Sequence, residues 1–231
     1  MSQTILITGA NRGLGLEFTR QYLEYQNQVI ACCRDLNKAL ALHDLKEKYP
    51  HTLTLIQLDV TDTDAVHKLA QDLEHTELDL LINNAGVYGP KHKPLGALCA
   101  EDFEEVLKVN TIAPLILSQA FIPHLAQTQG KVAFITSRMG SITDNQSGGS
   151  YLYRASKAAL NALGKSLALD LEADDIKVLI IHPGWVKTDM GGEHAWITPE
   201  QSISQMRKLI HSITLDQSGQ FWHCDGSKLP W

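Results

Sequence analysis

Cysteine is scarce in this chain of 231 residues and never takes the spacing of a metal site or a disulfide framework. The four cysteines are Cys32, Cys33, Cys99 and Cys224, and none of them belongs to a C-x-x-C pair. The ten histidines also lack the H-E-x-x-H pattern and other metal-ligand spacings. We therefore expect no metal ion and no disulfide, and reduced thiols in a cytoplasmic protein.

Positive charge and long apolar runs are lacking as well. Lysine and arginine number 20 against 26 aspartates and glutamates, so the net charge of −6 gives no indication of a nucleic-acid partner. We find no apolar run as long as a membrane span, and no charged and apolar leader of the signal-peptide type. These absences favour a cytoplasmic protein that has no membrane or nucleic-acid partner.

Short apolar segments alternate with helical patterns along the whole chain. Apolar, β-branched runs predict strands at 4–7, 29–33, 53–58, 79–82, 131–136, 177–181 and 220–223. Helical spacing predicts helices at 16–23, 36–49, 63–73, 101–123, 151–171 and 199–211. This alternation predicts an α/β fold with a doubly wound parallel sheet, in which ligands bind at the carboxyl ends of the strands. Because we find no internal repeat or linker, we expect residues 1–231 to form a single domain.

A glycine-rich turn joins the first predicted strand to the first predicted helix. Its pattern is Thr8-Gly9-x-x-x-Gly13-x-Gly15, which differs from the common G-x-G-x-x-G spacing of dinucleotide sites. Glycines allow the backbone to approach a pyrophosphate, and the N-terminus of the following helix offers free N–H groups and a positive dipole end. Glycines also mark ordinary tight turns, so this pattern alone leaves both a cofactor loop and a structural turn open.

The second predicted strand ends at the position that selects between NAD and NADP. A carboxylate there binds the ribose hydroxyls of NAD, whereas an arginine accommodates the 2′-phosphate of NADP. This strand ends in uncharged Cys33 with Arg34 next, and Arg12 in the glycine turn supplies a second cation. Asp35 lies at the distance expected for the NAD carboxylate, and both arginines are alternatively solvated surface charges. We favour NADP(H), with NAD(H) as the alternative.

Polar residues also stand after the next two predicted strands. Asp59 is placed to read an adenine amino group or, alternatively, to cap the helix that begins near Thr63. The fourth strand runs into Asn83-Asn84-Ala85-Gly86, whose small and amide side chains suit a backbone that passes close to a ligand. Asn110 falls among apolar residues of the helix predicted at 101–123, so it needs a hydrogen-bond partner if it is buried.

Tyr153 and Lys157 are four residues apart on the helix predicted at 151–171, which places them on one helical face. An unperturbed phenol has a pKa of about 10, and a nearby ammonium group favours the phenolate and lowers that pKa. A tyrosine so tuned can give a proton to a carbonyl oxygen as hydride arrives, or take it back from an alcohol. The same spacing also occurs in amphipathic surface pairs, which this pattern alone does not exclude.

The chain resembles the short-chain dehydrogenase/reductase family over nearly its whole length. The resemblance rests on the glycine turn, Asn83-Asn84-Ala85-Gly86, Asn110, Ser137, Tyr153-x-x-x-Lys157 and Pro183-Gly184, in that order and approximate spacing. Residues 185–192 and 225–231 are similar to the subgroup that contains sniffer-type carbonyl reductases and bacterial C-factor proteins.

This resemblance implies one Rossmann-type domain with a mostly parallel seven-stranded sheet, and hydride transfer between NAD(P) and a carbonyl or alcohol without a metal. It implies that Tyr153 is the acid/base, that Ser137 hydrogen-bonds the substrate oxygen, and that Lys157 holds the nicotinamide ribose and lowers the tyrosine pKa. It also implies that Asn110 supports a water molecule linking Lys157 to solvent. The cofactor-binding residues implied are Gly9, Asn11, Arg12, Gly13, Leu14, Gly15, Arg34, Asp59, Val60, Asn83, Ala85, Gly86, Tyr153, Lys157, Pro183, Gly184, Val186 and Thr188.

Two details depart from the commonest pattern of this family. The loop between Ser137 and Tyr153 is long, so Ser141 is a rival for Ser137, although Ser137 directly follows a predicted strand. Ser137 also lacks the G-x-S-x-G context of a hydrolase nucleophile. The substrate loop near 185–200 is short, which suggests an open site. It offers Trp185, Met190 and Trp196 but no charged anchor for a substrate.

The first functional hypothesis is an NADP(H)-dependent carbonyl reductase for a small or medium aldehyde, ketone or quinone. The alternative is a non-catalytic nucleotide-binding protein of the C-factor type that acts in signalling. The glycine spacing and the short C-terminal region disfavour a sugar-nucleotide epimerase. The resemblance further implies a homodimer or homotetramer, in which the apolar faces of helices 101–123 and 151–171 pair across a dyad; alternatively, these faces pack only on the sheet.

Overall fold

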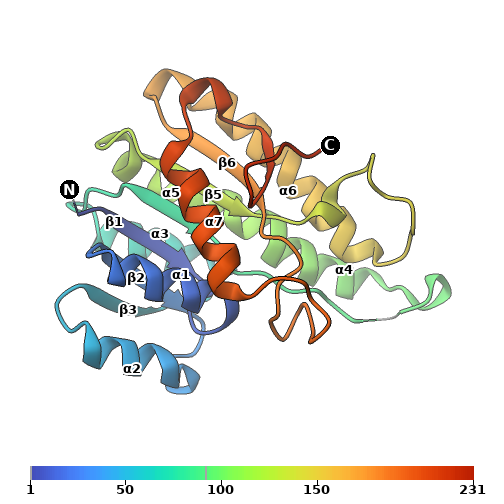
Figure 1. Cartoon of the computed structure of the whole chain (residues 1–231), viewed down its shortest axis with the longest axis horizontal. Helices are drawn as coiled ribbons and strands as arrows, with labels where there is room; N and C mark the ends of the chain where they lie inside the picture. Colours follow the sequence, from blue (N-terminus) through green and yellow to red (C-terminus); the bar gives the residue numbers. More distant parts are fainter. Residues whose placement is uncertain (1, 92) are drawn as a thin grey trace.

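The computed structural model describes residues 2–91 and 93–231 and places their strands in a single parallel sheet (Figure 1). Within these residues the sheet has seven strands in the order β3-β2-β1-β4-β5-β6-β7, and every strand pairing is parallel. The strands are β1 (Thr4–Thr8), β2 (Gln28–Cys33), β3 (Leu53–Gln57), β4 (Leu80–Asn83), β5 (Lys131–Ile135), β6 (Lys177–His182) and β7 (Phe221–His223). The doubly wound α/β fold predicted from the alternating pattern is confirmed.

Helices cover both faces of the sheet, as Figure 1 shows for α7 on the near face. They are α1 (Gly13–Glu24), α2 (Leu40–Lys48), α3 (Thr63–Asp72), α4 (Ala100–Leu107), α5 (Ala113–Ala126), α6 (Tyr151–Asp170) and α7 (Pro199–Ser212). Successive strand residues point to opposite faces, so Ile5 and Ile7 join the core under α1, α2 and α7. Leu6 between them joins the core under α3, α5 and α6. Both faces are buried, which explains why the strands read as continuous apolar runs.

The helix predicted at 36–49 is shorter than expected because its first turn is separate. Residues Leu36–Lys38 form a 3₁₀ turn, and α2 begins only at Leu40. The Asp35 carboxylate accepts a hydrogen bond of 3.0 Å from the backbone N–H of Asn37. This local bond satisfies an N–H at the start of the turn and favours the tighter conformation there.

The long helix predicted at 101–123 is interrupted by a π-helical segment, Lys108–Ile112, between α4 and α5. The N–H of Ala113 bonds the carbonyl of Lys108, five residues back. Pro114 has no N–H with which to bond the carbonyl of Asn110, so the regular α-helical ladder cannot continue through this point. The extra residue in the turn places the Asn110 side chain in the interior, where it is fully buried.

By length and composition alone, the helical stretch Ala100–Ala126 is long and apolar enough to cross a membrane. The sequence pattern missed this stretch, because Asn110 and Pro114 interrupt the apolar run but not the helix. In the structure, Leu117 and Phe121 of this stretch pack into the core between α3, α6 and the sheet. Its apolar character is therefore explained in part by burial within the protein.

Candidate active site

The glycine turn between β1 and α1 has no room for a side chain at two of its positions, Gly9 and Gly15. A Cβ atom on Gly15 would stand 2.2 Å from the carbonyl oxygen of Gly9, and one on Gly9 would stand 2.9 Å from Cα of Ala85. Gly9 also has a φ of +62°, which L side chains rarely adopt. The turn is thus pressed against the end of β4 and cannot be widened by a side chain.

The N-terminus of α1 is left open for an anion. Its N-cap residue, Arg12, makes no side-chain capping bond, and the first turn contains no acidic residue. The unpaired N–H groups and the positive end of the helix dipole are the features that bind a phosphate group. Together with the close-packed glycines, they fit the pyrophosphate of a dinucleotide.

Asn84, rather than Asn83, braces this turn. The Asn84 amide donates hydrogen bonds of 2.9 Å and 3.1 Å to the carbonyl oxygens of Thr8 and Gly9. Asn83 was expected to face the cofactor, but its side chain is buried and donates to Ser118 Oγ at 3.1 Å. Strand β4 extends one residue further than predicted, so Asn83 still points into the layer of α5.

Arg34 lies just after the end of β2 and forms no ion pair with an acidic side chain among the described residues. Asp35 is engaged locally, since its carboxylate pairs with Lys38 at 3.1 Å and accepts from Asn37. Arg12 forms an exposed ion pair of 3.0 Å with Asp189, which lies in the loop after β6. The arrangement offers a 2′-phosphate a free guanidinium at Arg34, and Arg12 as a second one after exchange of its partner.

Asp59 lies near Arg34 but does not cap α3. Its carboxylate accepts hydrogen bonds of 2.9 Å and 2.8 Å from the backbone N–H and the hydroxyl of Thr61. Asp62 caps α3 instead, by accepting from the N–H of Ala65 at 3.0 Å. Burial acts to raise the pKa of Asp59, but the Thr61 hydrogen bonds and the Arg34 cation outweigh it and lower the pKa. The helix-cap alternative for Asp59 is therefore wrong, and an ionised carboxylate remains just after the end of β3.

Tyr153 and Lys157 lie on one face of α6 and are both buried. The Lys157 ammonium stands 5.8 Å from the centre of the Tyr153 ring and donates a hydrogen bond of 2.8 Å to the carbonyl oxygen of Ile135. Ser137, two residues after the end of β5, places its hydroxyl beside the Tyr153 phenol. The surface-pair alternative for this spacing is wrong, since the two side chains point into the protein.

Burial sets the protonation of both groups. It raises the pKa of Tyr153 to about 12, an effect that the Ser137 hydroxyl partly offsets and the nearby Tyr88 adds to. Burial also lowers the pKa of Lys157 to about 8. We expected the ammonium to lower the tyrosine pKa, but in this structure it is bound to Ile135 instead. At neutral pH the phenol keeps its proton.

Asn110 ties the segment after β4 to α6. Its side-chain amide forms two hydrogen bonds of 2.8 Å with the backbone of Val87 and one of 3.0 Å with Ser156 Oγ. Asn110 and Lys157 approach Gly86 from two sides, because a Cβ there would stand 3.3 Å from Asn110 Oδ1 and 3.7 Å from Lys157 Nζ. The water expected between Asn110 and Lys157 stays a prediction.

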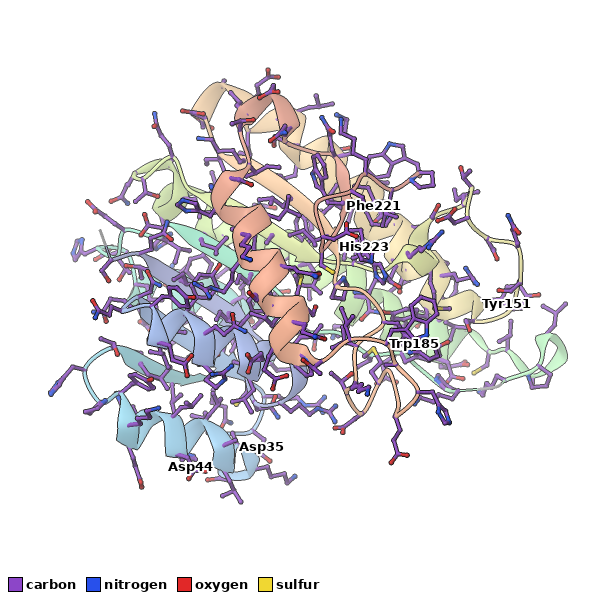
Figure 2. The ribbon with its side chains drawn as sticks, in the orientation of Figure 1. Asp35, Asp44, Tyr151, Trp185, Phe221 and His223 are labelled. Atoms are coloured by element: carbon purple, nitrogen blue, oxygen red, sulfur yellow. The ribbon has the colours of Figure 1, made fainter. Side chains whose placement is uncertain are left out.

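A cleft of about 1050 Å³ opens beside Tyr153. Leu14 of the glycine turn, Ser137, Tyr153, Pro183, Gly184, Val186 and Thr188 all line it, so residues predicted for cofactor and substrate meet in one cavity. Figure 2 shows that Trp185 and His223, which line the cleft, lie well apart from Asp35. Asp35 lies just after β2, on the side where the adenosine is expected. The cleft that contains the buried proton donor therefore reaches the glycine turn at Leu14.

The chain shares this arrangement with known proteins. The family model described as short chain dehydrogenase matches residues 3–196. The protein belongs to the short-chain dehydrogenase family.

Curated members of the family include two relatives of different kinds. The 1-hydroxy-2-glutathionyl-2-methyl-3-butene dehydrogenase of Rhodococcus sp. (strain AD45) is 37% identical over 235 residues, covering 99% of each chain. The C-signal of Myxococcus xanthus is 40% identical over 155 residues, which are 67% of this chain and 93% of the C-signal.

Two solved structures show the same fold over the full chain. The carbonyl reductase Sniffer of D. melanogaster superposes with a TM-score of 0.96 at 34% identity, covering 100% of both chains. The NADPH-bound carbonyl reductase from chicken fatty liver has a TM-score of 0.92 at 36% identity, covering 100% of this chain and 99% of its own. The predicted resemblance to the Sniffer and C-factor subgroup is confirmed by these similarities.

Ser137 and Ser141 were the two candidates for the serine that bonds the substrate oxygen, and of these two only Ser137 lines the cleft. The Ser141 hydroxyl donates a hydrogen bond of 2.9 Å to the carbonyl oxygen of Trp231 and accepts one from the N–H of Asp144. Ser141 thus holds the C-terminal segment against the loop and is committed to a structural contact.

The short loop at 185–200, after β6, covers more of the cleft than we expected from its length. Val186 pairs with Ile197 in a β-bridge, which folds the loop back on itself. Met190 Sδ comes within 4.0 Å of the Tyr153 hydroxyl, and Trp185 packs edge-on against Trp196 with ring centres 5.5 Å apart. The expected open site is therefore partly closed, by apolar side chains.

Sequence reasoning missed two residues of the cleft, Tyr88 and His223. Tyr88 stacks on Tyr153 with ring centres 4.6 Å apart. His182 and His223 pack edge-on at 5.3 Å, and burial, more than the nearby His223 and Arg138, lowers the pKa of His182 to about 3. The register of β6 on β7, which sets His182 opposite His223, was the signal that could have revealed this pair.

Proposed function

We propose that this protein is an NADP(H)-dependent carbonyl reductase for small or medium aldehydes, ketones or quinones. The observation that carries the proposal is the buried, protonated phenol of Tyr153, with the Ser137 hydroxyl beside it, in the cleft that Leu14 of the glycine turn also lines. A phenol in this state is a proton donor, and the neighbouring hydroxyl is positioned to hold a carbonyl oxygen.

The nicotinamide cofactor, when bound, supplies the hydride. Ser137 donates a hydrogen bond to the substrate oxygen and orients it toward Tyr153. Tyr153 then gives its proton to that oxygen, so the product leaves as an alcohol. Lys157, whose pKa is about 8, is a stronger acid than the phenol and lies on the same helical face, so in this proposal it returns the proton. Met190, whose sulfur lies 4.0 Å from the Tyr153 hydroxyl, limits water access to that hydroxyl.

The high pKa of Tyr153 favours reduction over oxidation at neutral pH. Reduction uses the protonated phenol, which is the form present until about pH 12 in the protein alone. Oxidation of an alcohol needs the phenolate as base, and this form is scarce at pH 7. The carbonyl reductases among the similar structures support this direction, whereas the Rhodococcus relative is named as a dehydrogenase.

NADP(H) is proposed over NAD(H) on the charges at the end of β2. Arg34 has no acidic partner among the described residues, while Asp35 is engaged by Lys38 and Asn37. A similar carbonyl reductase was solved with NADPH, which supports the same choice. In this proposal Arg34 contacts the 2′-phosphate and Asp59 lies by the adenine.

The replacement Tyr153→Phe tests the proposal. It removes the donated proton, so we expect kcat/KM for aldehyde reduction to fall about 10²–10⁴-fold. NADPH binding, followed by fluorescence titration, should change little. Tyr25→Phe is the matched control, because Tyr25 is exposed, lies outside the cleft and has a hydroxyl that makes no hydrogen bond within the described residues. Full turnover in Tyr153→Phe would contradict the proposed acid.

A signalling protein without turnover is the second candidate, and the similarity to the C-signal is the observation that favours it. A pure nucleotide binder has no use for a buried proton donor beside a serine hydroxyl, so the site argues against it. Tight NADPH binding with no turnover across aldehydes, ketones and quinones would favour this candidate over the reductase.

A further inference from the structure

The cleft beside Tyr153 is positively charged although the chain as a whole carries a net charge of −6. Lys91, Lys93, Arg138 and Arg154 line it, and Asp144 is the acidic residue among the described lining residues. This charge could not be predicted from the sequence, because the four cations come from two loops and a helix that are far apart along the chain.

Two of these cations are neutralised within the protein. Arg138 pairs with Asp144 through a contact of 2.7 Å, and Lys93 pairs with Asp102. Lys91 and Arg154 form no ion pair with the described residues. The excess charge of the cleft therefore comes from these two side chains.

Arg154 is half-buried and only partly satisfied. Its Nη2 donates to Ser147 Oγ at 2.9 Å, and its Nη1 makes a long contact of 3.4 Å with the carbonyl oxygen of Met139. Its Nε is buried and has no hydrogen-bond partner. The buried Nε is out of reach of a ligand, but the two terminal nitrogens keep unused N–H groups at the cleft, and a carboxylate accepts two parallel N–H bonds from such a pair.

The position of Arg154 connects it to the reacting group. It follows Tyr153 on α6, and the Tyr88 ring that stacks on Tyr153 belongs to the segment that continues to Lys91. The Tyr88 hydroxyl also bonds Ser150 Oγ at 2.8 Å, which joins this segment to the start of α6. Both free cations thus border the cleft within a few residues of the two stacked tyrosines.

We propose that Arg154, assisted by Lys91, binds a carboxylate on the substrate while the carbonyl group of the same molecule meets Tyr153. The inference rests on the proposed reductase function and narrows its substrates to carbonyl compounds that carry an anionic group. Trp185, Met190 and Trp196 then contact the apolar part between the two polar ends.

Matched aromatic aldehydes test this subsite. The wild-type protein should reduce 4-carboxybenzaldehyde with a higher kcat/KM than methyl 4-formylbenzoate, mainly through a lower KM. Arg154→Gln should lower the ratio of the two kcat/KM values about tenfold or more, because a charge-assisted hydrogen bond is lost. Lys91→Gln should lower it less. Lys208→Gln, which removes an exposed charge on α7 outside the cleft, should leave the ratio unchanged.

The salt dependence of the same ratio of kcat/KM values is a second measurement. Sodium chloride at about 0.5 M should weaken the preference for the acid over the ester in the wild type but not in Arg154→Gln, because salt screens the charge of Arg154. If Arg154→Gln slows both aldehydes equally, Arg154 only braces the loop around Met139 and Ser147, and the subsite is refuted while the reductase function stands.

Binding separates failure of the subsite from failure of the proposed function. In the presence of NADP⁺, calorimetry should show that 4-(hydroxymethyl)benzoate binds the wild type at least tenfold more tightly than its methyl ester, a difference lost in Arg154→Gln. This preference without turnover of either aldehyde would refute the reductase and retain the subsite. Equal binding of acid and ester would refute the subsite, whatever the turnover.

Discussion

At the scale of single residues, Lys157 is where function and stability conflict. A buried ammonium with one hydrogen bond, to Ile135, costs folding free energy, and its lowered pKa of about 8 expresses that cost. In the unfolded chain a lysine has a pKa near 10.4, so between these values the unfolded state binds more protons than the folded state. The cost is complete below about pH 8 and disappears as the pH rises toward 10.

Lys157→Met should therefore stabilise the protein at pH 7 while it abolishes turnover. The gain has an upper limit of about 3 kcal/mol, from the shift between the two pKa values, and the carbonyl of Ile135 left without its donor reduces it. Urea unfolding at pH 7 and at pH 9.5 measures the effect. The difference between variant and wild type should shrink at the higher pH, and a difference that does not depend on pH would contradict the assigned cause.

Arg34 is the residue that should select the cofactor. Arg34→Asp replaces the cation at the end of β2 with a carboxylate, which repels a 2′-phosphate and favours free ribose hydroxyls. We expect the ratio of kcat/KM with NADPH to that with NADH to fall by about two orders of magnitude, the effect of removing a charge-assisted contact and adding repulsion. Lys208→Asp on α7 is the control for charge alone, because Lys208 is exposed, lies outside the cleft and forms no ion pair with the described residues. An unchanged ratio in Arg34→Asp would remove the case for NADP.

The sequence could predict the positions of Tyr153, Lys157 and Ser137, because regular helical spacing or a strand end fixes each of them, and their roles stay predictions. It misplaced Asn83, since an error of one residue at the end of β4 turns a side chain to the opposite face of the sheet. It also misjudged the tyrosine pKa. That value depends on burial and on which acceptor Lys157 finds, and neither is contained in the spacing of two residues.

At the scale of elements, all seven strands were predicted from apolar runs, and their ends differ from the structure by one residue. The π-helical segment Lys108–Ile112 was not predicted, because it is stabilised by contacts of Asn110 with Val87 and Ser156 in distant segments. The partial closure of the cleft was missed for the same reason, since the bridge between Val186 and Ile197 forms only in the folded loop.

Gly164 determines how closely α6 packs on the sheet. A Cβ there would stand 2.8 Å from Ile180 Cγ1 and 3.2 Å from Phe134 Cδ2, so the helix has no room for a side chain. Gly164→Leu should lower the free energy of unfolding by about 1–3 kcal/mol, through overpacking of a filled core. Chemical denaturation measures this loss. Ser166→Leu, at an exposed position two residues along the helix, should have little effect, and equal losses would contradict the packing argument.

At the scale of the whole molecule, the sheet order brings together functional groups that are far apart in the chain. The glycine turn follows β1, Ser137 follows β5 and Pro183 follows β6, and parallel strands present all these ends at one edge. The fold could be predicted because this rule needs only the order of the elements. The charge of the cleft could not, because it depends on which of the cations pair with acidic side chains.

The π-helical segment before α5 and the helix α6 carry apolar side chains on the surface. Ile112, in the π-helical segment, is 53% exposed, and Leu169, near the end of α6, is 59% exposed. Leu117 and Phe121 show that another face of α5 packs on the sheet, so the outer apolar residues have no partner within the described chain. We propose, as the sequence resemblance implies, that these helices pair in a homodimer or homotetramer.

Light scattering coupled to size-exclusion chromatography should then give two or four times the mass of one chain. Ile112→Glu and Leu169→Glu should each shift the protein toward the monomer, because a buried, unpaired charge at an interface is costly. Leu40→Glu on α2 is the matched control, since Leu40 is 72% exposed and lies outside the pairing helices. A wild-type protein that elutes as a monomer at micromolar concentration would show that the two helices pack only on their own sheet.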